Sequence, residues 1–220
     1  MNEVTLIAMT QPVEGMVPRT SEELIAYCAR VSNPENQDNM ETSAKLLHYL
    51  AHHSHWSPFE MVSVVMKVCT TRDIARQILR HRSFSFQEFS QRYAEIDTSR
   101  FVFRESRMQD ATNRQSSLPC DDADLAAWWN NAQREQWTES ISLYRRALDK
   151  GLAKEVARSL LPEGLTPSVM YMSGSLRSWI HYIQLRSGNG TQKEHQDVAR
   201  QCVEILLEKF PVLSEVLNGC

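Results

Sequence analysis

An amphipathic stripe in the second half of the chain constrains the fold more than any other feature. Apolar side chains recur every three or four residues from Leu125 to Leu148, which is the spacing of one face of a long α-helix. Glycine is scarce, with 7 among 220 residues. Few positions can therefore adopt a positive φ at low cost, which also favours helix. We interpret the tryptophans of the stripe as core or as an interface between subunits: Trp128, Trp129 and Trp137.

Shorter patterns around this helix indicate a mixed α+β protein. Apolar and β-branched runs predict strands at 4–9, 61–69 and 101–104. Helical spacing predicts further helices at 20–28, 44–51, 71–79, 155–161, 176–185 and 194–210. We expect residues 83–92 to form a loop or strand and the polar segment 107–119 to run over the surface, whereas 169–172 is too short to assign. Because strands and helices do not alternate regularly, the pattern predicts a single helix-rich domain over residues 1–220 with a small antiparallel or mixed sheet.

Composition excludes several classes of protein. Hydrophobic residues make up 42% of the chain and charged residues 23%, an ordinary balance for a globular protein. The net charge of −3 argues against a protein that coats nucleic acid. The five cysteines include no CxxC pair, which is typical of reduced thiols in a cytosolic protein. No apolar run is long enough for a membrane span, so we expect a cytoplasmic protein with neither a membrane nor a nucleic-acid partner.

The segment Arg80–Arg92 (RHRSFSFQEFSQR) combines groups that suit a nucleotide. It contains three arginines and one glutamate in a chain that is acidic overall. Arginine forks hold phosphate oxygens through paired hydrogen bonds, serine hydroxyls add donors, and phenylalanine rings can face a flat heterocycle. One alternative is a solvated arginine-rich loop whose phenylalanines belong to the core. Another is a non-catalytic module that binds single-stranded nucleic acid through this loop.

Four motifs of this sequence resemble those of the flavin-dependent thymidylate synthases. Arg80-His81-Arg82, followed after seven residues by Ser90, is similar to the RHR-x7-S signature of that family. Residues 55–60 and 28–32 resemble its H-x-[ST]-P-F-E and [AC]ARVS segments. Residues 177–181 and 184–186 resemble its C-terminal arginine helix, and residues 192–194 resemble its Q-x-E element. The matches keep the family's order along the chain.

The resemblance implies the fold and the reaction of that family. Such enzymes methylate dUMP at uracil C5, taking the carbon from 5,10-methylenetetrahydrofolate and the electrons from FAD reduced by NADPH. They use no protein nucleophile; an arginine that matches Arg186 stabilises charge on the pyrimidine. The resemblance also implies a homotetramer whose active sites are shared between subunits. The alternative explanation for an arginine at position 186 is structural: a positive charge interacts favourably with the dipole at a helix C-terminus.

The family's contacts carry over to positions of this chain, with Arg186 as the catalytic residue. By resemblance, the dUMP contacts fall on Gln77, Arg80, Glu88, Phe89, Ser90, Gln91, Arg92, Arg158 and Arg186. Phe89 and Gln91 are expected to act mostly through their backbone. The FAD contacts fall on Ser57, Arg80, His81, Arg82, Ser83, Glu88, Ser175, Arg177 and His181. Arg177 and His181 are four residues apart and so share one helix face.

Three positions depart from the family pattern, and two other signals are set aside. Gln87 and Ser175 stand where many members have asparagine, and Gly190 stands where relatives often carry a flavin-facing histidine. We expect flavin affinity or folate access to differ there. His48 and His52 have zinc-binding spacing, but no HExxH motif accompanies them, so we expect no metal site. The pair Gly188-x-Gly190 lacks the third glycine of a Rossmann fingerprint.

Overall fold

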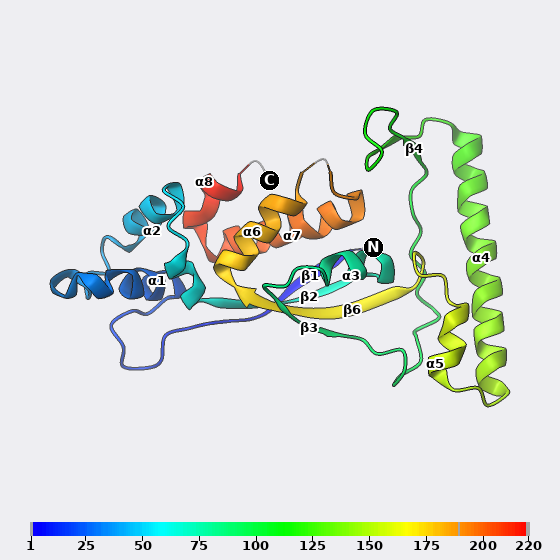
Figure 1. Cartoon of the computed structure of the whole chain (residues 1–220), viewed down its shortest axis with the longest axis horizontal. Helices are drawn as coiled ribbons and strands as arrows, with labels where there is room; N and C mark the ends of the chain where they lie inside the picture. Colours follow the sequence, from blue (N-terminus) through cyan, green and yellow to red (C-terminus); the bar gives the residue numbers. More distant parts are fainter. Residues whose placement is uncertain (1, 189, 219–220) are drawn as a thin grey trace.

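The computed structural model describes residues 2–188 and 190–218 and is built around a four-stranded antiparallel sheet (Figure 1). The strands lie in the order β1 (Glu3–Met9), β2 (Ser63–Thr71), β6 (Pro167–Ser175) and β3 (Ser85–Glu88). The central pair, β2 and β6, runs from Ser63 opposite Ser175 to Thr71 opposite Pro167. This pair joins segments far apart in the sequence, so the sheet requires both halves of the chain.

The two faces of the sheet differ because side chains alternate along each strand. Val64 and Val68 of β2 are fully buried, as is Met170 of β6. The opposite face carries more polar and exposed groups, such as Lys67 and its cross-strand neighbour Tyr171. Only one face therefore belongs to the core.

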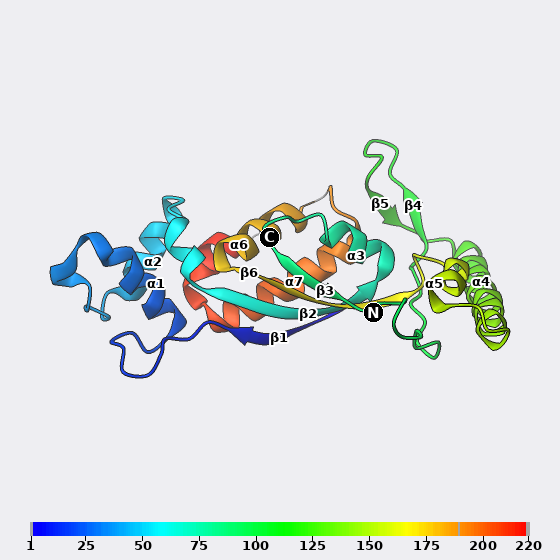
Figure 2. The same cartoon turned by 60° about the horizontal axis from the view of Figure 1, so that its bottom comes forward.

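Helices lie over that apolar face and beyond one end of the sheet, as Figures 1 and 2 show. They are α1 (Ser21–Ala29), α2 (Ser43–His52), α3 (Arg72–Ile78), α6 (Leu176–Arg186), α7 (Lys193–Lys209) and α8 (Ser214–Leu217). Short 3-10 helices lie at Arg30–Ser32, Pro34–Asn36, Ser57–Met61, Arg158–Leu160 and Pro211–Leu213. The buried Trp179 donates its indole N–H to the Val64 carbonyl at 3.1 Å, which ties α6 to β2.

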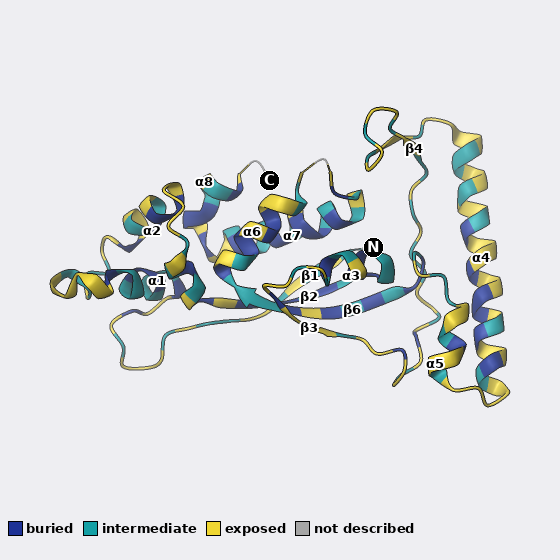
Figure 3. Ribbon diagram, viewed as in Figure 1, coloured by how far each residue is buried: buried dark blue, intermediate teal, exposed yellow. Residues whose placement is uncertain are grey.

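A second hydrophobic cluster lies beyond the edge of the sheet, on the long helix α4 (Ala123–Asp149). The C-terminal half of α4 packs with α5 (Lys154–Ala157) around Trp137 and Tyr144. The N-terminal half is more exposed (Figure 3), and Trp128 is 62% exposed. A hairpin of β4 (Arg107–Gln109) and β5 (Ser117–Pro119) projects beside it. Within the described ranges, no helix combines the length and apolarity of a membrane span.

The α+β class, the long helix and the strands expected at 4–9 and 61–69 are confirmed. The strand predicted at 101–104 is wrong, because that backbone bonds to side chains of α4 instead of a neighbouring strand. Gln133 accepts from the Arg104 N–H at 2.8 Å, and the Trp129 indole donates to the Arg104 carbonyl at 2.9 Å.

Two segments carry more regular structure than the sequence analysis assigned. Residues 169–172 lie inside β6, and the polar excursion 107–119 contains the β4–β5 hairpin. The central strand β6 was left unassigned because its methionines, serines and glycine carry little β-propensity. Hydrogen bonding to a strand on each side, β2 and β3, stabilises β6 despite its low β-propensity.

Gly174 of β6 marks a close approach that predicts a stability effect. A Cβ at this position would lie 2.5 Å from Cδ1 of Phe84, a ring that packs against Trp179 with centroids 4.9 Å apart. We expect Gly174→Ala to lower the free energy of unfolding by about 1–3 kcal/mol in urea titrations. Gly164→Ala is the control, because its Cβ would meet only Asp73 Oδ2 at 3.9 Å. Equal stability of the two variants would contradict the close-packing argument.

Candidate active site

The first of two candidate clusters, here called the Arg186 cluster, lies where the turn after α3 meets the end of α6. Arg186 donates from Nε to Nε2 of His81 at 2.8 Å. A guanidinium is always a donor, so His81 must accept through an unprotonated Nε2. Burial, reinforced by the positive charges of Arg186, His181 and Arg80, lowers the pKa of His81 to about 4. The imidazole is therefore neutral near neutral pH.

The bond to His81 uses only one edge of the Arg186 guanidinium. The two terminal nitrogens make no hydrogen bond to any part of the chain that the structure describes. Arg186 is half-buried at the C-terminal end of α6, where the helix dipole favours a cation. The guanidinium is thus fixed along one edge while the other edge is available to a ligand.

A cavity of about 300 Å³ lies beside this cluster, between the 3-10 helix Ser57–Met61 and α6. Its lining brings together three predicted FAD contacts, Ser83, Arg177 and His181, with the ring of Trp56. The other predicted contacts near it, Ser57, Arg80 and Arg82, are exposed. The sequence motifs from three parts of the chain therefore converge on one surface.

Ser175, another predicted FAD contact, has a structural role at the start of α6. Its Oγ accepts from the Ser178 N–H at 3.2 Å and so caps the helix. Hydrogen bonding by Ser175 and the contact with Arg177 lower the pKa of Glu60, and Arg177 lies 2.8 Å from that carboxylate. Serine and asparagine are both good N-caps, which explains why this departure from the family pattern preserves the local structure.

The second group, here called the Arg158 cluster, lies at the other end of β3 and contains Glu88–Arg92 with Arg158. Glu88 accepts from Ser168 Oγ at 2.7 Å and pairs with Arg72 at 3.3 Å, so its carboxylate already links β3 to β6 and α3. Arg158 is near enough to contribute to the lowered pKa of Arg72, of which burial is the main cause.

Two residues of the Arg158 cluster differ in how their polar groups are used. The Phe89 N–H, expected to serve a ligand, donates to the Val169 carbonyl at 2.9 Å. The Gln91 side chain is 4% exposed, and its Nε2 has no hydrogen-bond partner within the described ranges. An unpaired buried amide costs about 1–3 kcal/mol. The side chain of Gln91, more than its backbone, is therefore the group that calls for an additional partner.

Ser90 and Arg92 line a separate, open cavity of about 620 Å³ next to the start of α5. Arg92 Nε lies 3.1 Å from a carboxylate oxygen of Glu155 in the same cavity. Both side chains of that pair are largely exposed, so the pair is weak in water and an anionic ligand can compete for the guanidinium.

Strand geometry separates the two clusters within one chain. Phe89 lies beside Val169 of β6, whereas Ser83 lies beside Ser178 at the start of α6, which follows Ser175 at the other end of β6. From Val169 to Ser175 an extended strand advances about 20 Å. The structure therefore brings Gln77, Arg80 and Arg186 toward the predicted FAD contacts, but it does not bring Ser90, Arg92 or Arg158 to them.

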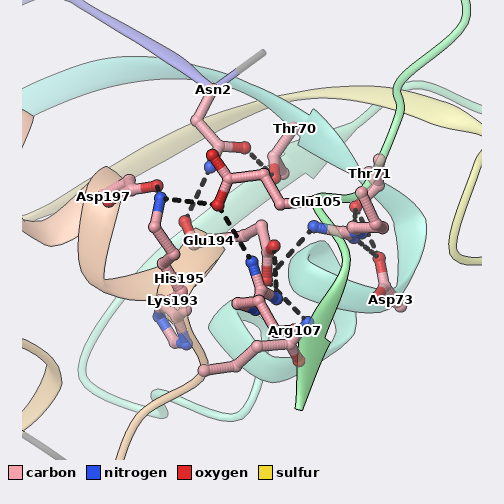
Figure 4. A network of polar contacts seen from close by, with 12 residues as sticks. Asn2, Thr70, Thr71, Asp73, Glu105, Arg107, Lys193, Glu194, His195 and Asp197 are labelled. Carbon is pink, nitrogen blue, oxygen red and sulfur yellow. Dashed lines mark hydrogen bonds and ion pairs between the residues drawn. The ribbon is translucent and has the colours of Figure 1, made fainter. Parts of the chain in front are cut away.

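A buried ionic network around Glu194 was missed by the sequence analysis (Figure 4). Glu194 pairs with Arg107 at 2.7 Å and with Arg104 at 3.4 Å, and Arg104 reaches Asp73 at 2.7 Å. Burial would raise the pKa of Glu194, but Arg104, Arg107 and Gln192 outweigh it and lower that pKa. The Q-x-E motif indicated Glu194. Its ion-pair partners Arg104 and Arg107 lie in a segment where the sequence shows no recognisable motif.

His195 was also missed, although its position carries a signal. It precedes Val198, Ala199 and Cys202 at helical spacing on the buried stripe of α7, where an imidazole is unusual. Its ring is 0% exposed, and its two nitrogens face Gln77 Oε1 at 3.4 Å and the Tyr182 hydroxyl at 3.0 Å.

Other features of the described ranges hold none of the predicted contacts. A cavity of about 1440 Å³ lies between the β4–β5 hairpin, α4 and the start of α7. No group of three His, Cys, Asp or Glu side chains in residues 2–188 and 190–218 is placed to hold a metal ion. Of the departing segment Gly188–Thr191, Asn189 lies outside the described residues, and Gly190 is exposed.

Comparison with known proteins decides the family. The model of a family described as "Thymidylate synthase complementing protein" matches residues 15–212. A probable flavin-dependent thymidylate synthase of Paramecium bursaria Chlorella virus 1 is 50% identical over 214 residues, or 97% of this chain and 97% of the relative. The flavin-dependent thymidylate synthase of Synechocystis sp. is 47% identical over 219 residues, or 98% and 99%. The chain belongs to the flavin-dependent thymidylate synthase family.

A solved structure supports the same conclusion for this flavin-dependent thymidylate synthase. A crystal structure of a UMP/dUMP methylase from Streptomyces cacaoi bound with 5-Br dUMP has a TM-score of 0.82 at 25% identity, covering 100% of this chain and 95% of that chain. The family, the enzyme class and the fold expected from the four motifs are confirmed. The alternative of a non-catalytic nucleic-acid module finds no support.

The two buried imidazoles predict a loss of stability in mild acid. Burial is the main cause that lowers the pKa of His81 to about 4 and that of His195 to about 3, whereas both titrate at about 6.5 in an unfolded chain. Between these values the unfolded chain binds more protons. The free energy of unfolding therefore falls as the pH drops from about 6.5 to about 4.

We expect His195→Asn to reduce proton uptake on unfolding by about one at about pH 5. The measurement is the slope of the unfolding free energy against pH, from urea titrations at several pH values. His52→Asn is the control, because that imidazole is exposed and meets water in both states. An unchanged slope in His195→Asn would show that the buried ring does not titrate as stated.

Proposed function

We propose that the chain methylates dUMP at uracil C5 to give dTMP, with 5,10-methylenetetrahydrofolate as carbon donor and NADPH-reduced FAD as hydride source. The observation that carries this proposal is the Arg186 guanidinium, held through Nε by neutral His81 at 2.8 Å beside the cavity that contains Ser83, Arg177 and His181. The names of the relatives support the same reaction.

The residues around this cavity fit FAD. A flavin dinucleotide needs cations for its pyrophosphate and aromatic or apolar surface for its ring system. Arg177 and His181 project from one face of α6 beside Trp56, and the exposed Arg80 and Arg82 precede Ser83, which also lines this cavity. These five side chains are the ones we propose to hold the cofactor. Once bound, FAD supplies the hydride equivalent that completes the methyl group.

Arg186 activates the pyrimidine in this proposal. Its unused edge donates to N3 and O2 of uracil and stabilises negative charge on the ring, so that C5 becomes a better nucleophile. His81 holds the guanidinium at Nε and, being neutral, adds no competing positive charge. A catalytic thiol is not needed, because charge stabilisation replaces covalent attack at C6.

We further propose that dUMP binds between subunits of a homotetramer. Ser90 and Arg92 of the Arg158 cluster line a cavity that contains none of Gln77, Arg80 and Arg186, and about 20 Å of extended strand separates Val169 beside Phe89 from the start of α6. Ser90 and Arg92 are exposed, and Gln91 has an unpaired buried amide nitrogen within the described ranges. The Arg158 cluster of one subunit facing the Arg186 cluster of another would supply the phosphate-binding arginines that the latter lacks.

We propose a reducing compartment, the cytoplasm, as the place of action. Cys28, Cys69, Cys120 and Cys202 are free thiols. Cys202 is fully buried, and burial raises its pKa. Cys28 and Cys69 are only half-buried, and thiols of this kind persist where disulfides are not favoured.

Arg186→Ala should retain FAD and lose methylation. Removing the charge stabilisation is expected to raise the barrier by about 3–4 kcal/mol, a rate loss of about 10²–10³. The measurement is tritium release from dUMP labelled at C5 with folate and NADPH present, and the flavin absorbance of the same preparation. Arg19→Ala, an exposed arginine before α1, is the control. A colourless wild-type protein, or full turnover by Arg186→Ala, would contradict the proposal.

Complementation between variants should reveal the shared site. Arg186→Ala and Arg158→Ala are each expected to be inactive. Coexpression in mixed tetramers should restore activity in about a quarter of the sites, those that pair the intact Arg186 of one subunit with the intact Arg158 of another. If the mixed tetramers stay as inactive as the separate variants, the two arginines act within one chain or not together.

A further inference from the structure

Five side chains next to the Arg186 cluster form one continuous series of hydrogen bonds, here called the relay. Tyr182 OH lies 3.0 Å from His195 Nε2, and His195 Nδ1 lies 3.4 Å from Gln77 Oε1. Gln77 Nε2 donates to Gln192 Oε1 at 2.7 Å, and Gln192 Nε2 donates to Glu194 Oε2 at 2.9 Å. The relay connects α6, α7 and α3 and ends on the carboxylate of Glu194.

The carboxylate decides the direction of every bond in the relay. Ionised Glu194 can only accept, so Gln192 must turn its NH2 toward Glu194 and its oxygen toward Gln77. Gln77 must then present its NH2 to Gln192 and its oxygen to His195. His195 consequently donates from Nδ1 and accepts at Nε2, and the Tyr182 hydroxyl donates to it. Glu194 thereby selects the Nδ1–H tautomer of the neighbouring His195, although its carboxylate makes no direct hydrogen bond to that imidazole within the described ranges.

Burial makes this arrangement rigid. His195 and Tyr182 are both 0% exposed, so a lost hydrogen bond cannot be replaced by water and leaves a polar group unpaired. The groups that face His195 do not favour a second proton. Burial, then the charge of Arg186 and the nearby His81, lower the pKa of His195 to about 3. The ring therefore stays neutral, as the relay requires.

The relay touches the Arg186 cluster at two points, Gln77 and Tyr182. Gln77 is one of the predicted dUMP contacts, and the relay leaves its second N–H available to an acceptor. Tyr182 packs edge-on against His81 with ring centroids 4.9 Å apart, directly behind the imidazole that holds Arg186. Displacement of His195 would loosen both groups.

We propose that His195 is a positioning residue for the pyrimidine nucleotide: it fixes the carboxamide of Gln77 and the Tyr182 ring so that the Arg186 cluster is preorganised for dUMP. This inference rests on the proposed function, since it assigns the nucleotide to that cluster. His195 itself touches neither substrate nor flavin.

The test measures dUMP affinity by calorimetry on the flavin-loaded protein, with a matched pair of replacements. Asparagine places its NH2 near the position of Nδ1 and can restore the bond to Gln77, whereas glutamine reaches the position of Nε2 and restores only the bond to Tyr182. We expect His195→Gln and His195→Phe to raise the Kd for dUMP about tenfold, and His195→Asn to raise it by no more than about threefold. Equal affinities for the asparagine and glutamine variants would overturn the proposal.

A double-mutant cycle with Gln77→Ala tests the route. If His195 acts through Gln77, His195→Phe adds little to the loss caused by Gln77→Ala, whereas additive losses would overturn the proposal. Val198→Ala, a buried truncation one turn further along α7, controls for general loosening and should lower thermal stability without changing the Kd. Wild-type protein that does not bind dUMP would refute the proposed function. Wild-type binding with unchanged affinity in His195→Phe would refute this inference alone.

Discussion

The antiparallel pairing of β2 with β6 is the interaction on which the candidate site depends. β2 leads into α3 at Thr71, and β6 leads into α6 at Ser175, at opposite ends of one ladder about 30 Å long. Helices of 7 and 11 residues advance about 10 Å and about 16 Å, so their C-terminal ends approach each other above the sheet. His81 and Arg186 lie just there. A register shift in the central pair would separate them, although neither residue belongs to a strand.

Desolvation gives the Arg186 cluster its electrostatic character. A fixed cation at the end of α6 lies next to two imidazoles that burial keeps neutral, His81 and His195. Had the His81 ring remained in water, it could take up a proton near neutral pH, and the acceptor of the Arg186 Nε–H would disappear. The same burial that costs stability in acid thus provides an uncharged partner for the guanidinium. That partner leaves the full positive charge of Arg186 directed at a ligand.

Local patterns predicted the elements whose stabilisation is local. The α4 stripe from Leu125 to Leu148 formed as expected. The helix predicted at 20–28 also formed, and it begins with a capping box in which Thr20 Oγ1 accepts from the Glu23 N–H at 3.1 Å. β6 was not assigned, because its stability comes from two partner strands. The segment 101–104 looked like a strand, but α4 satisfies its backbone through Gln133 and Trp129.

The candidate site shows the same division between motif and geometry. The motifs named Arg186, His81 and Arg177, which the structure places around one surface. They did not show that β3 holds Ser90 and Arg92 away from it, because distance along an extended strand depends on conformation and not on residue spacing alone. Tyr182 and His195 belong to no motif that was recognised. Their pairing is a tertiary contact between α6 and α7, visible in the sequence only as a histidine on an otherwise apolar helix face.

The network of Glu194 explains how α4 can influence a site it does not approach. Trp129 and Gln133 of α4 bind the Arg104 backbone, and the Arg104 side chain pairs with Glu194. Glu194 orients Gln192, which orients Gln77 at the Arg186 cluster. Since Arg104 and Arg107 keep the pKa of Glu194 low, that carboxylate remains an acceptor and the direction of the relay cannot reverse. The polar segment after residue 100 therefore supports the site structurally. Without Arg104 and Arg107, Glu194 could be protonated, and the carboxamides of Gln192 and Gln77 could then rotate by about 180° and exchange their NH2 and oxygen.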